Sequence, residues 1–260
     1  MPNFSPSHVL APVPRPLRAV LVAALAACTG SGQAAEKAAA RQPEPFVGTL
    51  VYEVGASGGN AEGVEMFRAA GPQRETVTWG SGGRLRLETV GGWMAGVTVA
   101  RFADSAFFVL DTAARTAEKA TVQSLNLEDA PPEMRVFMEA RLGPAEVERT
   151  DEEGTYAGRR CRMYTVRKSS MLRSGATARA CVAEDVRVRP TRYSFQNGGF
   201  GRMAPLPLQF GIREGLPLML EVNEQNTIVT YRAVSLTPGE PADSLFSVPA
   251  GYTVPADSAG

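Results

Sequence analysis

Short segments of alternating apolar and polar residues recur along this chain, and they constrain its fold more than any other feature. Each is bounded by Gly, Pro, Asp or Asn, and the clearest, residues 84–89, reads RLRLET. A period of two places Leu85 and Leu87 on one side of a strand and the charged residues on the other. The expected strands are residues 46–54, 64–69, 75–79, 84–89, 96–102, 106–111, 116–122, 146–150, 160–168, 178–188, 188–195, 215–222 and 227–236.

Short strands at such close intervals are typical of an antiparallel sheet rather than of alternating β–α units. Residues 80–84 (GSGGR) and 223–226 (NEQN) are expected to be the turns of two hairpins. The acidic residues at 151–153 and 184–185 are expected to lie in solvated bends. We therefore predict a mainly β fold with one or two helices, built as a curved antiparallel sheet or incomplete β-barrel.

One helix is expected at residues 129–142, after Asp129 as N-cap and before a Gly-Pro pair. Its apolar residues fall at helical spacing and form one stripe, which either packs on the sheet or covers the mouth of a barrel. Residues 196–212 mix Gly and Pro with apolar residues, so regular structure is not expected there. That segment either folds back over the core or lines a ligand-binding or membrane-facing surface.

The N-terminal segment has the layout of a secretory signal. Arg15 and Arg18 precede the apolar residues 19–27, a run too short to span a bilayer. The run ends in Leu-Ala-Ala-Cys, which resembles the lipobox of bacterial lipoproteins and makes Cys28 the expected lipidation site. The alternative is an ordinary signal peptide, with Cys28 a spare thiol. The expected organisation is a signal peptide at 1–27, a flexible tether at 28–45, one domain at 46–255 and a disordered tail at 256–260.

Charge and histidine content exclude several function classes. Residues 1–27 hold two arginines and no acid, so 25 basic and 27 acidic residues follow them, which gives no basic excess for a nucleic-acid partner. The single histidine, His8, lies in the signal segment. Its removal leaves no Ser-His-Asp or Cys-His catalysis and few zinc sites. We therefore expect a protein that is not an enzyme and has no catalytic residues, metal or cofactor.

Cys161 and Cys181 remain as a pair if Cys28 carries lipid. An even number of cysteines in an oxidising compartment favours a disulfide, and both residues lie in expected strands of one hairpin. We predict a structural disulfide between directly opposed residues. A redox role would more naturally use a CxxC spacing.

Four stretches together resemble a family of exported bacterial proteins that are grouped with the LolA/LolB-like lipoprotein-localisation factors. They are FVGTLVYEV (46–54), AGRRCRMYTV (157–166), GLPLMLEV (215–222) and DSLFSVPAGYTVP (243–255). The resemblance covers residues 46–255 and implies an incomplete barrel that is wrapped around a helix and holds an apolar cavity. It also implies that Phe246 and Tyr252 tuck against the edge of the sheet.

The expected function is that of a cell-envelope lipoprotein whose concave sheet face binds a lipid, an acyl chain or a lipoprotein. The alternative is an interaction or sensor module of an envelope complex, with a filled core and an envelope protein as partner. Thr29 after the anchor cysteine favours the outer membrane, facing the periplasm or the cell surface. The candidate ligand-binding residues are Tyr52, Leu85, Leu87, Phe107, Val109, Met134, Phe137 and Met138.

Overall fold

The computed structural model describes residues 45–92, 95–124, 146–168, 176–188, 193–197, 200–203, 206–209 and 215–255. Among these residues, no helix has both the length and the apolarity needed to cross a bilayer. The expected signal segment, most of the tether, the helix at 129–142 and the tail at 256–260 lie outside the described residues.

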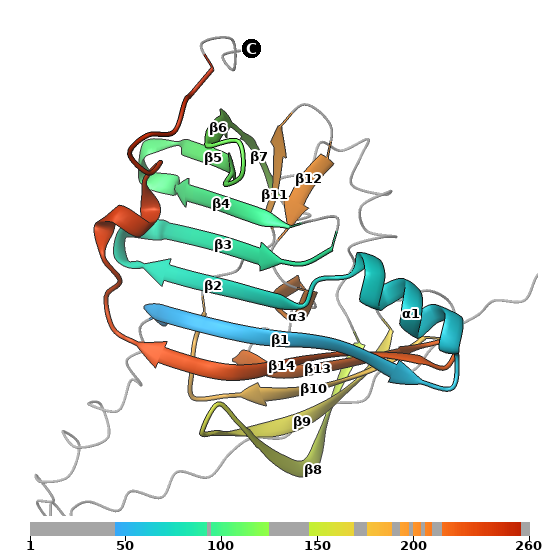
Figure 1. Cartoon of the computed structure of the whole chain (residues 1–260). Coiled ribbons are helices and arrows are strands. Elements are labelled where there is room, and N and C mark those ends of the chain that lie inside the picture. Colours follow the sequence, from blue (N-terminus) through green and yellow to red (C-terminus); the bar gives the residue numbers. More distant parts are fainter. Residues whose placement is uncertain are drawn as a thin grey trace, which may run out of the picture. The chain divides into compact units, whose positions relative to one another are not determined.

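Eleven strands form one open antiparallel sheet, in the order β6-β5-β4-β3-β2-β1-β14-β13-β10-β9-β8. Figure 1 shows them side by side, with the first strand next to the last in the middle of the sheet. The strands are β1 (Gly48–Gly58), β2 (Arg74–Gly80), β3 (Arg84–Val90), β4 (Gly96–Arg101), β5 (Ala106–Asp111), β6 (Thr116–Lys119), β8 (Glu146–Tyr156), β9 (Arg159–Lys168), β10 (Thr177–Ala183), β13 (Leu216–Glu224) and β14 (Thr227–Pro238).

A second sheet and a few helical segments complete the described structure. The second sheet has the order β12-β11-β7, built from β12 (Phe200–Met203), β11 (Tyr193–Asn197) and β7 (Thr121–Ser124). The helices are α1 (Ala61–Ala70) and the four-residue α3 (Leu206–Gln209). Single 3-10 turns lie at η2 (Ser81–Gly83), η3 (Phe102–Asp104) and η5 (Asp243–Phe246).

The main core lies on one side of the sheet, which we call the inner face. Along β1 and β2, the buried side chains of Leu50, Tyr52, Val77 and Trp79 alternate with more polar neighbours. Leu85 on β3 continues the same layer. On the opposite face of β4, β5 and β6, a smaller cluster contains Val97, Val99, Leu110 and Ala117. The two clusters follow from the period of two, since successive residues of a strand point to opposite faces.

The C-terminal segment covers part of that opposite face. Phe246 is 2% exposed, and a Cβ added at Gly80 would lie 2.9 Å from its ring, so the phenyl group packs on a position without a side chain. Val248 and Tyr252 pack on the smaller cluster, and Thr253 bridges to Thr116 of β6. The sequence-based expectation placed Phe246 and Tyr252 at the edge of the sheet. The described segment runs across a face, and only its end reaches the edge strand.

The mainly β fold with a curved antiparallel sheet is confirmed, as are both predicted hairpins. The turn between β13 and β14 is shorter than expected. Only Gln225 and Asn226 leave the ladder, with φ values of 50° and 63°. Positive φ at both central residues is the geometry of a two-residue type I′ turn.

The strand expected at residues 64–69 is wrong, because this segment is helix α1. Asn60 caps the helix, and its side-chain oxygen accepts a hydrogen bond from the Gly63 amide at 3.1 Å. Val64 is the buried residue of the helix, and Phe67 follows it at a spacing of three, so the apolar residues also fit a helical period. The apolar residues fit both helical and strand periodicity, and the Asn60 N-cap favours the helix.

Four other expected elements differ in extent. Residues 116–122 form two strands, β6 and β7, in different sheets. Residues 146–150 are the start of the longer β8, which continues through the acidic run at 151–153, so that run is not a bend. The strand expected at 178–188 ends at Ala183, and the next one, β11, belongs to the second sheet. Within 196–212, β12 and α3 are regular, and α3 accommodates Pro207 in its first turn, where a missing amide costs nothing.

The predicted disulfide between Cys161 and Cys181 is confirmed, with the two Cα atoms 5.3 Å apart. The strands that carry it, β9 and β10, are paired as expected, but the cysteines are not directly opposed. The register pairs Cys181 with Met163, two residues from Cys161, so the bridge runs diagonally across the pair. A bulge between Cys181 and Val182 in the pairing with β13 marks the same place.

Candidate functional site

The inner face brings together five of the eight candidate ligand-binding residues. Tyr52, Leu85, Leu87 and Val109 all belong to the main core cluster, and Phe107 packs against it. Tyr52 is fully buried, and its hydroxyl donates a hydrogen bond to the carbonyl oxygen of Pro217 at 2.5 Å. The remaining three candidates, Met134, Phe137 and Met138, lie outside the described residues. Contact of any of the eight with a ligand stays a prediction.

A groove of about 590 Å³ opens where β3 and β5 end and β4 and β6 begin. Its volume is within the range of ordinary ligand pockets. The residues that line it are 88–91, 95–97, 109–113, 116 and 118. Of the candidate residues, only Val109 belongs to this lining.

Two rows of paired residues on the inner face lead into the groove. In one row, Glu75 of β2 pairs with Thr89 of β3, which pairs with Gly96 of β4. Both Thr89 and Gly96 line the groove. Neighbouring strands lie about 4.8 Å apart, so Glu75 is one strand away from the groove wall.

The second row runs from Leu87 of β3 through Thr98 of β4 and Val109 of β5 to Glu118 of β6. Val109 and Glu118 line the groove. The groove thus lies at the ends of the strands, and its lining includes Val109 and Glu118 of the inner face as well as Val97 and Leu110 of the opposite face.

Glu75 carries the one buried carboxyl group in the described part of the chain, and the residue is 9% exposed. Its Oε2 atom has no hydrogen-bond partner among the described residues. Burial raises the pKa of its carboxyl group to about 7, because the apolar surroundings penalise the charged form. Burial, and then the nearby charge of Glu75, also raise the pKa values of Tyr52 and Tyr231. The rings of the two tyrosines meet edge to face, with centroids 6.4 Å apart.

Two more buried polar atoms lack a partner among the described residues, Nε1 of Trp79 and Oγ1 of Thr98. Both side chains belong to the inner face. Trp79 follows Glu75 by four residues on β2, and Thr98 pairs with Leu87. Leaving a buried donor or acceptor without a partner costs about 1–3 kcal/mol. The three atoms without a partner, on Glu75, Trp79 and Thr98, thus lie on the same face of the sheet.

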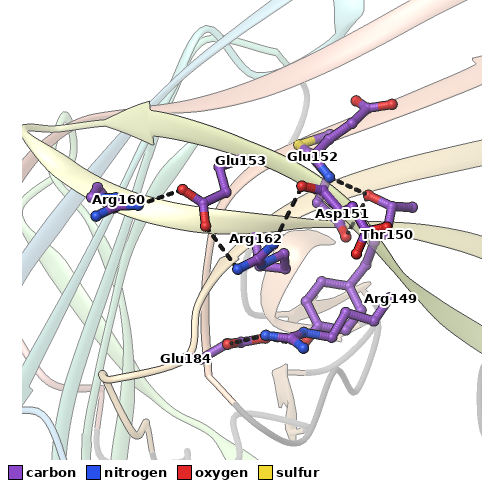
Figure 2. A network of polar contacts seen from close by, with 10 residues as sticks. Arg149, Thr150, Asp151, Glu152, Glu153, Arg160, Arg162 and Glu184 are labelled. Carbon is purple, nitrogen blue, oxygen red and sulfur yellow. Dashed lines mark hydrogen bonds and ion pairs between the residues drawn. The ribbon is translucent and has the colours of Figure 1, made fainter.

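Acidic residues of β8 and of the turn after β10 form ion pairs with arginines of β8 and β9 (Figure 2). Glu152 of β8 also pairs with Arg179 of β10. Glu184 accepts hydrogen bonds from Arg149 at 2.8 Å and from the hydroxyl of Tyr164 at 2.6 Å. Glu153 lies 2.7 Å from Arg162 and also pairs with Arg160. These contacts hold the pKa values of Glu184 and Glu153 below the usual range of a glutamate.

Asp185 behaves in the same way beside Arg159, which lowers its pKa. A glycosidase needs one carboxyl group with a raised pKa to act as general acid. The carboxyl groups at 153, 184 and 185 have the opposite property, so this network does not provide the carboxylate pair of a hydrolase. Among the described residues, no group of three or more metal-binding side chains occurs.

No family model and no curated protein matches the sequence. The chain is similar to the solved structure of PNGF-II, with 12% identity over 80% of this chain and 31% of that one, and a TM-score of 0.39. It is also similar to LprF from Mycobacterium bovis, with 7% identity over 80% and 90% of the two chains and a TM-score of 0.33. A third similar structure is the LolA superfamily protein NE2245 from Nitrosomonas europaea, with 8% identity over 79% and 91% and a TM-score of 0.29.

The chain spans less than a third of the length of PNGF-II, and about nine tenths of the lengths of LprF and NE2245. All three TM-scores are below 0.5.

Sequence reasoning missed Glu75, the most unusual side chain of the site. A charged residue at the start of an expected strand usually faces water. The available signal was its position, because Glu75, Val77 and Trp79 follow one another at a spacing of two and must share a face.

Proposed function

We propose that this protein is an exported lipoprotein, acylated at Cys28 and held at the outer membrane, that binds a lipid or acyl chain without catalysing a reaction. The anchor is supported by the Leu-Ala-Ala-Cys sequence after a short apolar run. The absence of histidine after residue 8 supports a binding protein rather than an enzyme.

The observation that carries the proposed binding is the groove itself, whose lining includes residues of the inner face. The row Leu87, Thr98, Val109 runs into a groove of about 590 Å³. Apolar surface of this kind stabilises a bound acyl chain by about 0.8 kcal/mol for each buried CH₂ group. A chain that enters through the groove would lie along side chains that are apolar for most of the row.

Burial favours a second candidate, the interaction module with a filled core. Tyr52, Leu85 and Leu87 are between 0% and 6% exposed, as in an ordinary core. In that case the groove is only a surface feature, and the envelope partner binds elsewhere on the protein.

Saturable binding separates the two functions. The full-length protein is purified from its own membranes, analysed by native mass spectrometry, then delipidated and titrated with an uncharged fluorescent apolar probe. Val109→Phe fills the groove and is expected to weaken probe binding by about tenfold or more. Val234→Phe is the matched control, since Val234 is 42% exposed on β14 and does not line the groove. No co-purifying lipid together with no saturable binding would leave the interaction module.

A further inference from the structure

Glu75 and the residues around the groove define which polar group an apolar ligand can carry. We infer that the site selects amphiphiles whose polar end is a cation or an uncharged hydrogen-bond donor, held by the Glu75 carboxyl group, and that it rejects anionic amphiphiles such as fatty-acid carboxylates. This inference rests on the proposed function, because it assumes that an apolar chain enters the site.

The free oxygen of Glu75 is the first argument. Oε2 is buried and has no partner among the described residues, although a buried carboxylate normally accepts several hydrogen bonds. The groups that face it are Tyr52 on β1 and Tyr231 on β14, and neither is a cation. A ligand ammonium or hydroxyl group would supply the missing donor. The hydrogen bond to an ionised group is about twice as strong as one between neutral groups.

The position of Glu75 is the second argument. Glu75 pairs with Thr89 on the neighbouring strand β3, and Thr89 lines the groove. The Glu75 carboxyl group therefore lies one strand away from the groove wall. We place the polar end of the ligand beyond Thr89, at Glu75, which does not itself line the groove but shares the inner face with Leu87 and Val109. The site then has the usual form of a ligand pocket, mostly apolar with a few placed polar groups.

The charge around the groove is the third argument. The lining contains the carboxylates Glu88, Asp111 and Glu118, and no lysine or arginine. Arg86 pairs with Glu88 at 3.0 Å. An entrance lined by acidic and no basic side chains favours cations over anions. A carboxylate that passed it would face the like charge of Glu75 at low dielectric constant.

Three probes with the same chain length and different polar ends test this inference: dodecylammonium, 1-dodecanol and dodecanoate. Each displaces the uncharged apolar probe from the delipidated full-length protein at pH 8 and 150 mM salt. Dodecylammonium is expected to bind about tenfold or more tightly than dodecanoate, with dodecanol between them. At pH 6 most of the Glu75 carboxyl groups are protonated, so the preference is expected to fall towards the value of about threefold or less that the rim charges alone give.

Glu75→Gln is expected to reduce the preference at pH 8 to about threefold or less, since only the rim charges remain. Glu65→Gln is the control, because Glu65 is an exposed residue of α1 that pairs with Arg68, and it should behave as the wild type. The inference is overturned if dodecanoate binds the wild type as tightly as dodecylammonium, or if the wild-type preference is the same at pH 6 and pH 8. If none of the three probes binds, the proposed function itself fails, which is a different result.

Discussion

The guanidinium carbon of Arg84 lies 5.0 Å from the centroid of the Phe246 ring. Arg84 also pairs with Asp243 and with Glu240, and the carboxyl group of Glu240 accepts the Ser81 amide at 3.1 Å. One arginine at the turn between β2 and β3 therefore fixes the start of the C-terminal segment through charge and through its contact with an aromatic ring.

Phe246→Ala is expected to lower the free energy of unfolding by about 3–5 kcal/mol, because it empties a site that is 2% exposed against Gly80. Urea denaturation followed by circular dichroism measures the change. Leu245→Ala is the matched control, since Leu245 is 38% exposed, and it should cost less than about 1 kcal/mol. Equal effects of the two substitutions would contradict the packing of the C-terminal segment on the sheet.

Replacing both Cys161 and Cys181 by alanine is expected to lower the free energy of unfolding by about 3 kcal/mol, since their sequence separation is 20 residues. The same loss should occur when the wild type unfolds in a reducing agent, and the double variant should not respond to that agent. Peptide mapping without reduction should recover the two cysteines in one linked fragment. Two free thiols in the oxidised protein would reject the bridge.

Glu75→Gln is expected to change how stability depends on pH. The carboxyl pKa is about 7 in the folded protein and 4.5 as the ordinary value, so the folded state binds its proton more tightly than the unfolded state. The contribution of this group to stability is therefore fully present below pH 4.5, falls as pH rises through this window and is lost above pH 7. The loss from this group is about 3 kcal/mol.

In the Gln variant this decline should be absent, so it should be more stable than the wild type at pH 8. Chemical denaturation at pH 5, 6, 7 and 8 measures both curves. Glu65→Gln should follow the wild type at every pH, because its side chain is 70% exposed. If all three proteins showed the same dependence of stability on pH, Glu75 would not be desolvated.

Cys28→Ser is expected to move the protein from the membrane fraction to the soluble fraction, because the thiol is the proposed acylation site. Density-gradient separation of inner and outer membranes tests where the wild type is held. Ala27→Ser, which keeps the cysteine and a small residue before it, is the control. Membrane association of the Cys28→Ser variant at the wild-type level would reject the anchor.

The strands were predictable because most of them have one buried face and one more solvent-exposed face. Arg84 to Thr89 alternates in the sequence, and in β3 Leu85 and Leu87 are buried while Arg84 and Arg86 are not. The same pattern predicted Tyr52 and Val109 as residues of one face, and both belong to the main cluster. Alternation specifies a face, and it carries no information about the order of the strands in the sheet.

The incorrect predictions for α1 and β8 have local causes that the alternation of apolar and polar residues does not reveal. Helix α1 depends on one hydrogen bond from the Gly63 amide to Asn60, and a segment of ten residues with few apolar positions fits either period. The length of β8 depends on Thr150, whose hydroxyl donates to the Met163 carbonyl and accepts from the Glu152 amide. These bonds support a bulge at which four steps of β8 oppose two of β9, so the acidic run stays within the strand.

The candidate site was predictable in its apolar part and not in its polar part. Leu87 and Val109 followed from the strand pattern, whereas the groove depends on where four strands begin and end. Tyr52 and Tyr231, which the charge of Glu75 affects, come from β1 and β14. The topology of the sheet brings β1, β2 and β14 side by side, and a local sequence pattern does not predict which strands become neighbours.

The place of β1 beside β14 determines when this sheet can become continuous. Thr49 pairs with Thr237, and in the sheet β14 alone joins the half that contains β1 to β6 with the half that contains β8 to β13. A chain that is free to fold only as far as β13 holds two half-sheets, with the backbone edges of β1 and β13 unpaired. The entropy of closing so long a loop is lost before these edges meet, so the joining step comes late and is slow. Until that step, the exposed edges can pair with another incompletely folded copy.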